Sequence, residues 1–205
     1  MSDISAIMRT APVIPVLIIE NVAHARPVAE ALVEGGLRVL EVTMRTPCAL
    51  EAIAEMRRVE GAIVGAGTVL NPAHLDQALA AGSEFIVSPG LTESLGAAAI
   101  ESRVPFLPGV ANAGDIMRGM DMGLSHFKFF PAEASGGLKA LKAITGPFSD
   151  ARFCPTGGVT QASAPDWLAH PSVLCVGGSW IVPKGAPDTA AITSNAKAAS
   201  ALAQG

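Results

Sequence analysis

The sequence is poor in charged side chains, which make up only 16% of its 205 residues, whereas 50% of the residues are hydrophobic. Its formal net charge is −4, and lysine and arginine are not clustered anywhere along it. Because a basic patch is the usual mark of a site for nucleic acid or an anionic membrane, neither partner is expected. So low a charge content favours a sheet that is buried on both faces over an amphipathic surface fold.

The sequence also lacks a long apolar run. Residues 13–19 are apolar, but this run is too short to span a bilayer and contains Pro15, so it predicts a strand. The N-terminal residues do not show the charged, apolar and small-residue succession of a signal peptide. Cys48, Cys154 and Cys175 have no C-x-x-C spacing, so free thiols in a reducing, cytoplasmic compartment are expected.

The histidines are not spaced as metal ligands, so a metal-dependent enzyme is disfavoured and neither a metal nor another cofactor is expected. They are His24, His74, His126 and His170. The segment Gly65-x-Gly67 could suggest a dinucleotide-binding turn. However, residue 70 is leucine where the third glycine should stand, which disfavours that interpretation.

Short apolar segments alternate with helix-like segments along the whole sequence. Strands are predicted at residues 13–19, 39–43, 63–67, 85–88, 106–109, 127–130, 152–155 and 173–176. Helices are predicted at residues 25–34, 49–58 and 72–81, with helix starts at Thr46-Pro47, Asn71-Pro72 and Thr92, helix stops at Gly35-Gly36, Gly82 and Gly123, and a last helix from Ala190.

About eight strand-then-helix units predict one α/β domain over residues 1–205, a single-domain (β/α)8 TIM barrel. Residues 2–10 look like an extra N-terminal helix that would cover the floor of the barrel. An open doubly wound sheet is the alternative, because it is built from the same units.

A lysine in the middle of an apolar strand is the most unusual feature. Lys128 stands between Phe127 and Phe129, and strand alternation places its side chain on the same face as His126 and Phe130. Lysine is almost never fully buried without a partner or a task. Aromatic neighbours would strip water from the ammonium and favour the neutral amine, the nucleophile of Schiff-base chemistry. The alternative is a lysine whose head reaches solvent.

Polar residues gather where the predicted strands end, which is where barrels of this kind carry their chemistry. Glu41, Thr43 and Arg45 share one face of the second strand. A buried Glu41 needs a partner, for which Arg45 and Lys128 are the candidates. Arg45 could instead hold a substrate carboxylate with two hydrogen bonds. The alternative for Glu41 and Arg45 is an ion pair that only closes the barrel.

Two glycine pairs, Gly157-Gly158 and Gly177-Gly178, end the last two strands. Without Cβ atoms their backbone N–H groups can close on an anion, and barrels commonly bind phosphate after the seventh and eighth strands. Neither pair adjoins a lysine or arginine, so backbone donors and Ser179 would carry the binding. An amine, a carboxylate, an arginine and these turns together predict carbonyl chemistry on a phosphorylated 2-oxo acid.

Several segments of the sequence resemble the motifs of the 2-keto-3-deoxy-6-phosphogluconate (KDPG) aldolase / 4-hydroxy-2-oxoglutarate (KHG) aldolase family. They are LEVTMRT at residues 40–46, GAGTVL at 65–70, SPG at 88–90, FKFFPAE at 127–133, RFCPTGG at 152–158 and GGSW at 177–180. The resemblance implies a homotrimeric (β/α)8 barrel of the Entner–Doudoroff pathway. This class I aldolase would cleave KDPG to pyruvate and glyceraldehyde 3-phosphate.

The same resemblance implies roles for individual residues. Lys128 would form the Schiff base and Glu41 would act as the general acid and base. The residues that it places around the substrate are Arg45 and Thr68 at the carboxylate, Pro89 and Phe130 at the pyruvate, Thr156 at the hydroxyls, and Gly157, Gly158, Gly178 and Ser179 at the phosphate. Main activity on unphosphorylated 4-hydroxy-2-oxoglutarate, a decarboxylase working through the same imine, and a phosphate-binding barrel that acts only as a sensor are the alternatives.

Overall fold

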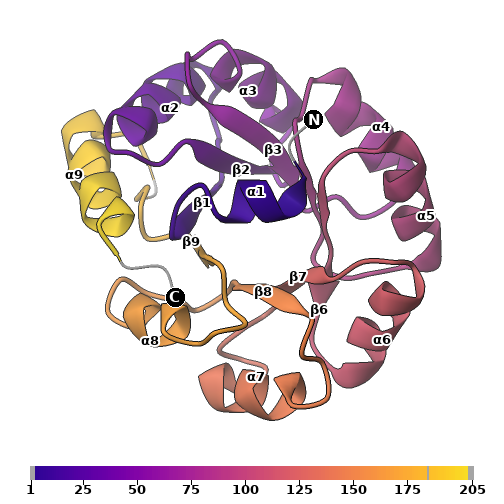
Figure 1. Cartoon of the computed structure of the whole chain (residues 1–205). Helices are drawn as coiled ribbons and strands as arrows, with labels where there is room; N and C mark the ends of the chain where they lie inside the picture. The colour runs from indigo at the N-terminus through magenta and orange to yellow at the C-terminus, as the bar shows by residue number, and fades with distance from the viewer. Residues whose placement is uncertain (1–2, 184, 203–205) are drawn as a thin grey trace.

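The computed structural model describes residues 3–183 and 185–202, and its helices surround a curled set of parallel strands (Figure 1). The strands are β1 (Val13–Leu17), β2 (Val39–Thr43), β3 (Ile63–Gly67), β4 (Ile86–Val87), β5 (Phe106–Leu107), β6 (Gly109–Val110), β7 (His126–Phe129), β8 (Arg152–Pro155) and β9 (Val176–Gly178). The helices are α1 (Ile4–Met8), η1 (Val22–His24), α2 (Ala25–Glu34), α3 (Ala49–Met56), α4 (Pro72–Ala80), α5 (Glu93–Ser102), α6 (Ala113–Asp121), α7 (Gly137–Thr145), α8 (Ala164–Leu168) and α9 (Thr189–Ser200).

The strands follow one another in chain order through two parallel sheets. One sheet has the order β5-β4-β3-β2-β1-β9 and the other the order β6-β7-β8. Only Pro108, which has no N–H to donate, separates β5 from β6, so the single strand predicted at residues 106–109 is divided there. Parallel bridges Phe153↔Val173 and Thr156↔Gly177 connect β8 with the segment that leads into β9 and with β9 itself. The fold is therefore a single-domain α/β fold with a curled parallel sheet.

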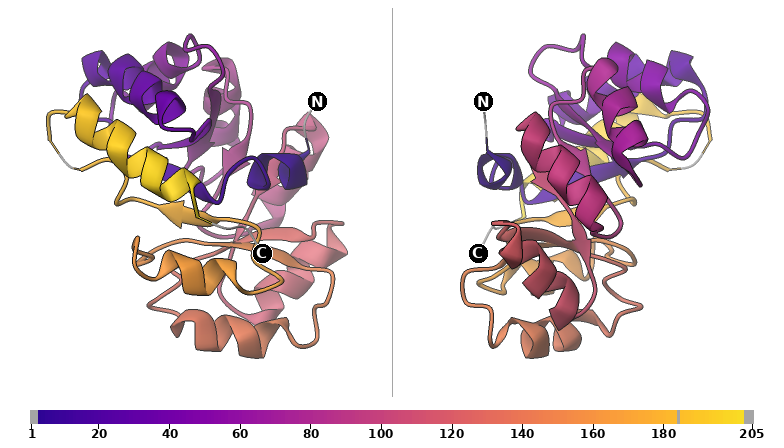
Figure 2. Two further views of the ribbon diagram at one scale, coloured as in Figure 1. Left: turned by 60° about the vertical axis from the view of Figure 1, so that its left-hand side comes forward. Right: turned by 90° about the vertical axis from the view of Figure 1, so that its right-hand side faces the viewer.

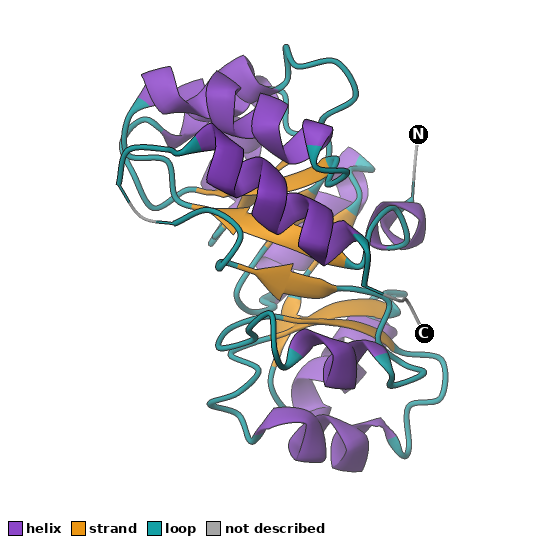
Figure 3. Ribbon diagram, turned by 90° about the vertical axis from the view of Figure 1, so that its left-hand side faces the viewer, coloured by secondary structure: helices purple, strands orange, loops and turns teal. Residues whose placement is uncertain are grey.

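Side-chain alternation along each strand divides the core into an outer and an inner cluster. Leu40 and Val42 belong to the large outer cluster between strands and helices, whereas Val39 belongs to the inner one. Phe127 and Phe129 also lie in the outer cluster, as predicted. Figure 3 shows the strands between layers of helices, so the outward side chains of the strands pack against helices and form the outer cluster. Lys128 therefore faces the inside of the curled sheet.

Helix α1 lies at one end of the strands, apart from the other helices (Figures 2 and 3). Asp3 caps it by accepting a hydrogen bond from the Ala6 N–H at 2.7 Å. Its Ile7 and Met8 side chains are buried in the inner cluster. The helix is shorter than the predicted residues 2–10, of which Ser2 lies outside the described residues.

The last helix packs beside α2 and so brings the two ends of the fold together (Figure 1). A Cβ on Gly35, the C-cap of α2, would lie 2.3 Å from the Ala196 Cβ, so glycine permits this contact. The prediction of a helix from Ala190 is confirmed over Thr189–Ser200, and residues 203–205 lie outside the described chain. Within the described ranges, we find no helix with the length and apolarity needed to cross a membrane.

Several predicted boundaries are wrong by a few residues. The first strand ends at Leu17 rather than at residue 19, because its pairing with β2 ends there, and the Ile19 carbonyl accepts from the Thr46 hydroxyl at 2.6 Å instead. Thr46 does not cap α3, because the helix begins only at Ala49 with Cys48 as its N-cap. The last strand is Val176–Gly178 rather than residues 173–176, since Val173 makes only an isolated bridge.

The predicted caps of two other helices are confirmed. The side chain of Asn71 accepts from the His74 N–H at 2.9 Å, and that of Thr92 accepts from the Leu95 N–H at 3.3 Å. The predicted glycine stop after α4 also agrees, because Gly82 has φ +91° just beyond the helix. Local capping signals therefore position the loops that follow β3 and β4.

Candidate active site

The inside of the curled sheet holds a buried ion pair between Lys128 and Glu41. The Lys128 Nζ lies 2.9 Å from Glu41 Oε1, and the two residues are 5% and 3% exposed. Of the two partners that the sequence allowed for Glu41, the structure selects Lys128. The Nζ also lies 5.4 Å from the centroid of the Phe130 ring, within cation–π range. The reading of Lys128 as a lysine whose head reaches solvent is wrong.

One glycine of β3, Gly67, makes room for the Glu41 carboxylate. The parallel register places Glu41 opposite Gly65 and Thr43 opposite Gly67. A Cβ on Gly67 would lie 2.2 Å from Glu41 Oε1 and 2.8 Å from its Cδ, distances that real atoms do not adopt. The carboxylate therefore occupies the space that a side chain at residue 67 would need.

The sequence analysis gave Gly67 no role. The signal was visible as glycine at residues 65 and 67, two of the inward positions of this strand, but only the structure shows which side chain fills the space at each.

Arg45 and Thr68 meet at the ends of β2 and β3. The Arg45 Nε donates a hydrogen bond to the Thr68 hydroxyl at 3.2 Å. Thr68 has a φ of +61°, an unusual conformation for a β-branched residue and one that clusters at functional sites. Arg45 is exposed and pairs with no carboxylate in the described chain, so its guanidinium can receive the carboxylate of a ligand.

Pro89 lies in the loop between β4 and α5, directly against β6. A Cβ on Gly109 would lie 2.1 Å from the Pro89 carbonyl oxygen, so glycine allows this approach. Gly109 is itself the register partner of Lys128. Within the loop, the Ser88 hydroxyl donates to the Gly90 carbonyl at 2.6 Å. Pro89 is thus held against β6, the strand that neighbours the lysine strand, and its place at the pyruvate stays a prediction.

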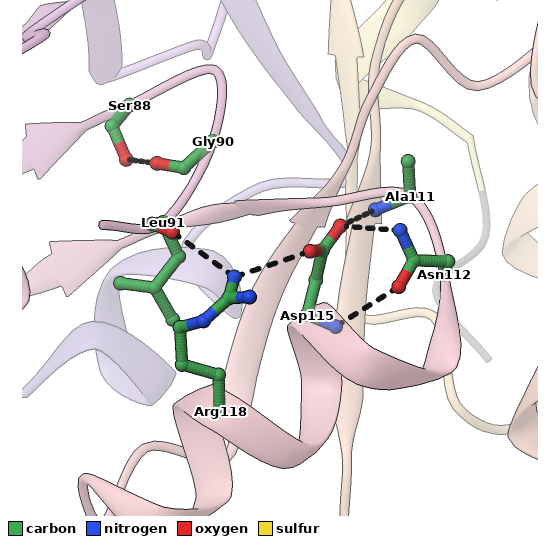
Figure 4. Close-up of polar contacts among 7 residues, drawn as sticks. All are labelled: Ser88, Gly90, Leu91, Ala111, Asn112, Asp115 and Arg118. Carbon is green, nitrogen blue, oxygen red and sulfur yellow. Dashed lines mark hydrogen bonds and ion pairs between the residues drawn. The ribbon is translucent and has the colours of Figure 1, made fainter. Parts of the chain in front are cut away.

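Helix α6 anchors the end of the same loop (Figure 4). The Arg118 guanidinium donates to the Leu91 carbonyl and to the Asp115 carboxylate, both at 3.3 Å. Asp115 also accepts from the Ala111 N–H and from the Asn112 amide, both at 3.0 Å. The contacts among Ala111, Asn112, Asp115 and Arg118 are local to the start of α6, whereas the bond from Arg118 to Leu91 spans 27 positions and could not be predicted from the sequence.

The predicted phosphate residues lie after β8 and at the end of β9. Gly157 and Gly158 have φ values of +99° and +84°, which favour glycine. Thr156 is buried and forms the parallel bridge to Gly177 that brings these two segments together. A Cβ on Gly178 would lie 2.5 Å from the Trp180 ring, so this glycine has the indole packed on it.

Ser179 is exposed at the end of β9 and shares a cavity with Arg45. The cavity has a volume of 580 Å³, and Val16 and Ile18 of the β1 end contribute to its wall. The cavity therefore connects Arg45, which is expected to bind the substrate carboxylate, with Ser179, which is expected to bind the substrate phosphate, across the end of β1. The structure brings every predicted site residue to the inside or the carboxyl-terminal end of the strands.

Two cysteines lie inside the curled sheet, and a half-buried histidine begins β7. Cys154 and Cys175 belong to the inner cluster, and the hydrogen bond with Cys154, together with complete burial, raises the pKa of the Cys175 thiol well above its usual range. A protonated thiol is a poor nucleophile, so Cys175 acts as a core residue, and Cys154 packs in the same cluster. Burial likewise lowers the pKa of His126, whose Nδ1 lies 3.1 Å from the Ser125 hydroxyl. No cluster of three or more potential metal-binding side chains occurs among residues 3–183 and 185–202.

This chain is similar in sequence to known aldolases. Residues 4–195 match the family model described as KDPG and KHG aldolase. The chain is 64% identical over 202 residues to the 2-dehydro-3-deoxy-phosphogluconate aldolase of Zymomonas mobilis. This alignment covers 98% of the chain and 97% of the relative.

Two solved structures superpose closely. A KDPG aldolase of Zymomonas mobilis, crystallised with 3-phosphoglycerate, has a TM-score of 0.98 at 63% identity and covers 98% of this chain and 97% of its own. The Legionella pneumophila KDPG aldolase, with pyruvate captured as a covalent carbinolamine, has a TM-score of 0.94 at 44% identity and covers 98% of this chain and 99% of its own. The chain described here belongs to the KDPG and KHG aldolase family.

Proposed function

We propose that this protein is a class I aldolase, a lyase that cleaves 2-dehydro-3-deoxy-6-phosphogluconate to pyruvate and glyceraldehyde 3-phosphate in the Entner–Doudoroff pathway. The observation that carries the proposal is the buried Lys128–Glu41 pair, with 2.9 Å between Nζ and Oε1. A covalent pyruvate adduct in the Legionella relative and a phosphorylated acid bound to the Zymomonas relative support the same chemistry.

The ion pair sets up the first step of the reaction. Transfer of one proton from the Lys128 ammonium to the Glu41 carboxylate gives a neutral amine and a carboxylic acid that already touch. The amine attacks the C2 ketone of the substrate, and the acid supplies the proton with which the carbinolamine oxygen leaves as water. The product is an iminium on Lys128, which acts as an electron sink.

The same carboxylate serves the cleavage step. Glu41, ionised again, removes the proton of the C4 hydroxyl, the C3–C4 bond breaks, and its electron pair moves into the iminium to give an enamine. Glyceraldehyde 3-phosphate leaves. Glu41 then returns the proton to C3, and water hydrolyses the new iminium to release pyruvate. Phe130 and Pro89 line the pyruvate, and Arg45 with Thr68 holds its carboxylate.

The distal half of the substrate lies over the glycine turns in this proposal. Thr156 reads the hydroxyls, and the backbone of Gly157, Gly158 and Gly178 with the Ser179 hydroxyl surrounds the phosphate. The positive φ values of the first two glycines support this role, because such turns present backbone N–H groups to anions.

We also propose that residues 1–205 form one aldolase domain in which the strands close into a complete (β/α)8 barrel with its floor covered by α1. The bridges between β8 and the β9 segment and the burial of Ile7 and Met8 support this arrangement. The homotrimer implied by the family resemblance and the cytoplasmic location expected from the free cysteines stay predictions.

Steady-state kinetics on two substrates test the proposal. The purified chain should release pyruvate from KDPG with a higher kcat/KM than from unphosphorylated 4-hydroxy-2-oxoglutarate, the other substrate in the name of the family. The opposite ratio would make the second activity the main one. Release of pyruvate from neither substrate would refute the proposal.

A further inference from the structure

Glu133 contacts the phosphate-side glycine turn but has no role in the reaction described above. Its backbone N–H donates to the Gly157 carbonyl at 3.0 Å. A Cβ on Gly158 would lie 2.7 Å from both Cβ and Cγ of Glu133, so the glutamate stem packs directly on this glycine. Glu133 therefore links the exit of the lysine strand β7 with the turn that follows β8.

The Glu133 carboxylate is held from the other side by Trp167 of α8. The indole Nε1–H donates to Glu133 Oε1 at 3.1 Å. Trp167 is only 2% exposed, and its ring lies 6.3 Å from that of Phe129, so the donor is fixed by the outer core. A fixed donor restrains the glutamate, and the glutamate in turn restrains the glycine turn.

We propose that Glu133 is a positioning residue that holds the Gly157–Gly158 turn in its phosphate-binding conformation, with Trp167 as its anchor. This inference rests on the proposed function. Both glycines have positive φ, and glycine loses more conformational freedom on folding than any other residue, so the turn needs external restraint to keep its N–H groups aligned. Alignment of these donors matters for a phosphorylated substrate and not for an unphosphorylated one.

The role requires a hydrogen-bond acceptor and not a negative charge. A carboxylate turned towards a bound phosphate would repel it, whereas the indole bond holds Oε1 against α8. Glutamine keeps an oxygen acceptor of the same reach and removes the charge. Glu133→Gln is therefore the conservative variant, and Glu133→Ala removes both the acceptor and the packing on Gly158.

The test compares the two substrates across these variants. In Glu133→Ala, KM for KDPG should rise about tenfold, because the variant loses both the hydrogen bond from Trp167 and the packing on Gly158. Its kcat, and both constants for 4-hydroxy-2-oxoglutarate, should stay within about twofold of the unmodified protein. Glu133→Gln should retain the original KM. Inorganic phosphate as a competitive inhibitor should bind Glu133→Ala about tenfold more weakly.

Two further variants keep the test decisive. Trp167→Phe removes the donor but preserves an aromatic ring in the core, and it should raise KM for KDPG alone even where Glu133→Ala fails to fold. Glu30→Ala removes a glutamate paired with Arg26 on the surface of α2 and should change nothing.

Equal losses on both substrates, or a Glu133→Gln variant as weak as Glu133→Ala, would overturn the inference. Failure of the unmodified protein to cleave either substrate would instead overturn the proposed function.

Discussion

A methyl group added at Gly67 tests the geometry of the catalytic pair without replacing either member. In Gly67→Ala the new Cβ would lie 2.2 Å from Glu41 Oε1, whereas an ordinary contact needs about 3.5 Å. The oxygen must therefore retreat by about 1.3 Å, and its 2.9 Å hydrogen bond to Lys128 opens beyond bonding distance. A misplacement of about 1 Å in a catalytic group costs on the order of 10²-fold in rate. We expect kcat on KDPG to fall by that amount.

A double-mutant cycle isolates this effect from general damage to β3. Alanine at residue 41 removes Cγ, which would lie 2.7 Å from the new Cβ, together with the carboxylate, so Gly67→Ala should cost far less of the residual kcat in the Glu41→Ala background than of the native kcat. Gly146→Ala, at a surface helix end where the new Cβ makes only an ordinary 3.7 Å contact, serves as the control. Activity of Gly67→Ala within threefold of the native enzyme, or equal costs in both backgrounds, would refute the reasoning.

Three other perturbations give separate outcomes. Glu41→Gln should slow turnover by about 10²–10⁴-fold while the imine with pyruvate still forms, and full activity would remove Glu41 from the mechanism. Arg118→Ala frees the Leu91 carbonyl and should raise KM for KDPG about threefold with little change in kcat. Arg58→Ala breaks a comparable i,i+3 pair away from the loop, so an equal effect there would contradict the positioning role. Burial lowers the pKa of His126, so the unfolded chain binds more protons below about pH 6.5 and the free energy of unfolding should fall as pH drops. Urea unfolding at about pH 7.5 and about pH 5.5 should show a smaller fall for His126→Gln than for the native protein, and identical falls would contradict this assignment.

Much of the fold could be predicted from local patterns in the sequence. Alternation placed Phe127 and Phe129 on the helix side and Lys128 on the inner side, because the period of a strand fixes which side chains share a face. The bounds of β2, β3 and β8 agree with their predicted ranges. The strand predicted at 106–109 was divided at Pro108, and the last strand was displaced, because those bounds depend on pairing with neighbours.

The site residues could be named from the sequence, but their contacts could not. Glu41 and Lys128 are 87 positions apart, so alternation showed that each faces inward without showing which partner Glu41 takes. The need for glycine at residue 67 depends on where the Glu41 side chain ends. The hydrogen bond between Glu133 and Trp167 likewise joins residues 34 positions apart, which become neighbours only when segments that follow different strands fold side by side.

The central claim is that the buried Lys128 amine forms a covalent imine with a 2-oxo acid. Reduction of the protein with borohydride in the presence of pyruvate, followed by mass spectrometry of its peptides, tests this claim most directly. The account predicts one reduced pyruvate attached to Lys128 and no adduct in Lys128→Met. An unmodified Lys128, or pyruvate attached to another lysine, would contradict it.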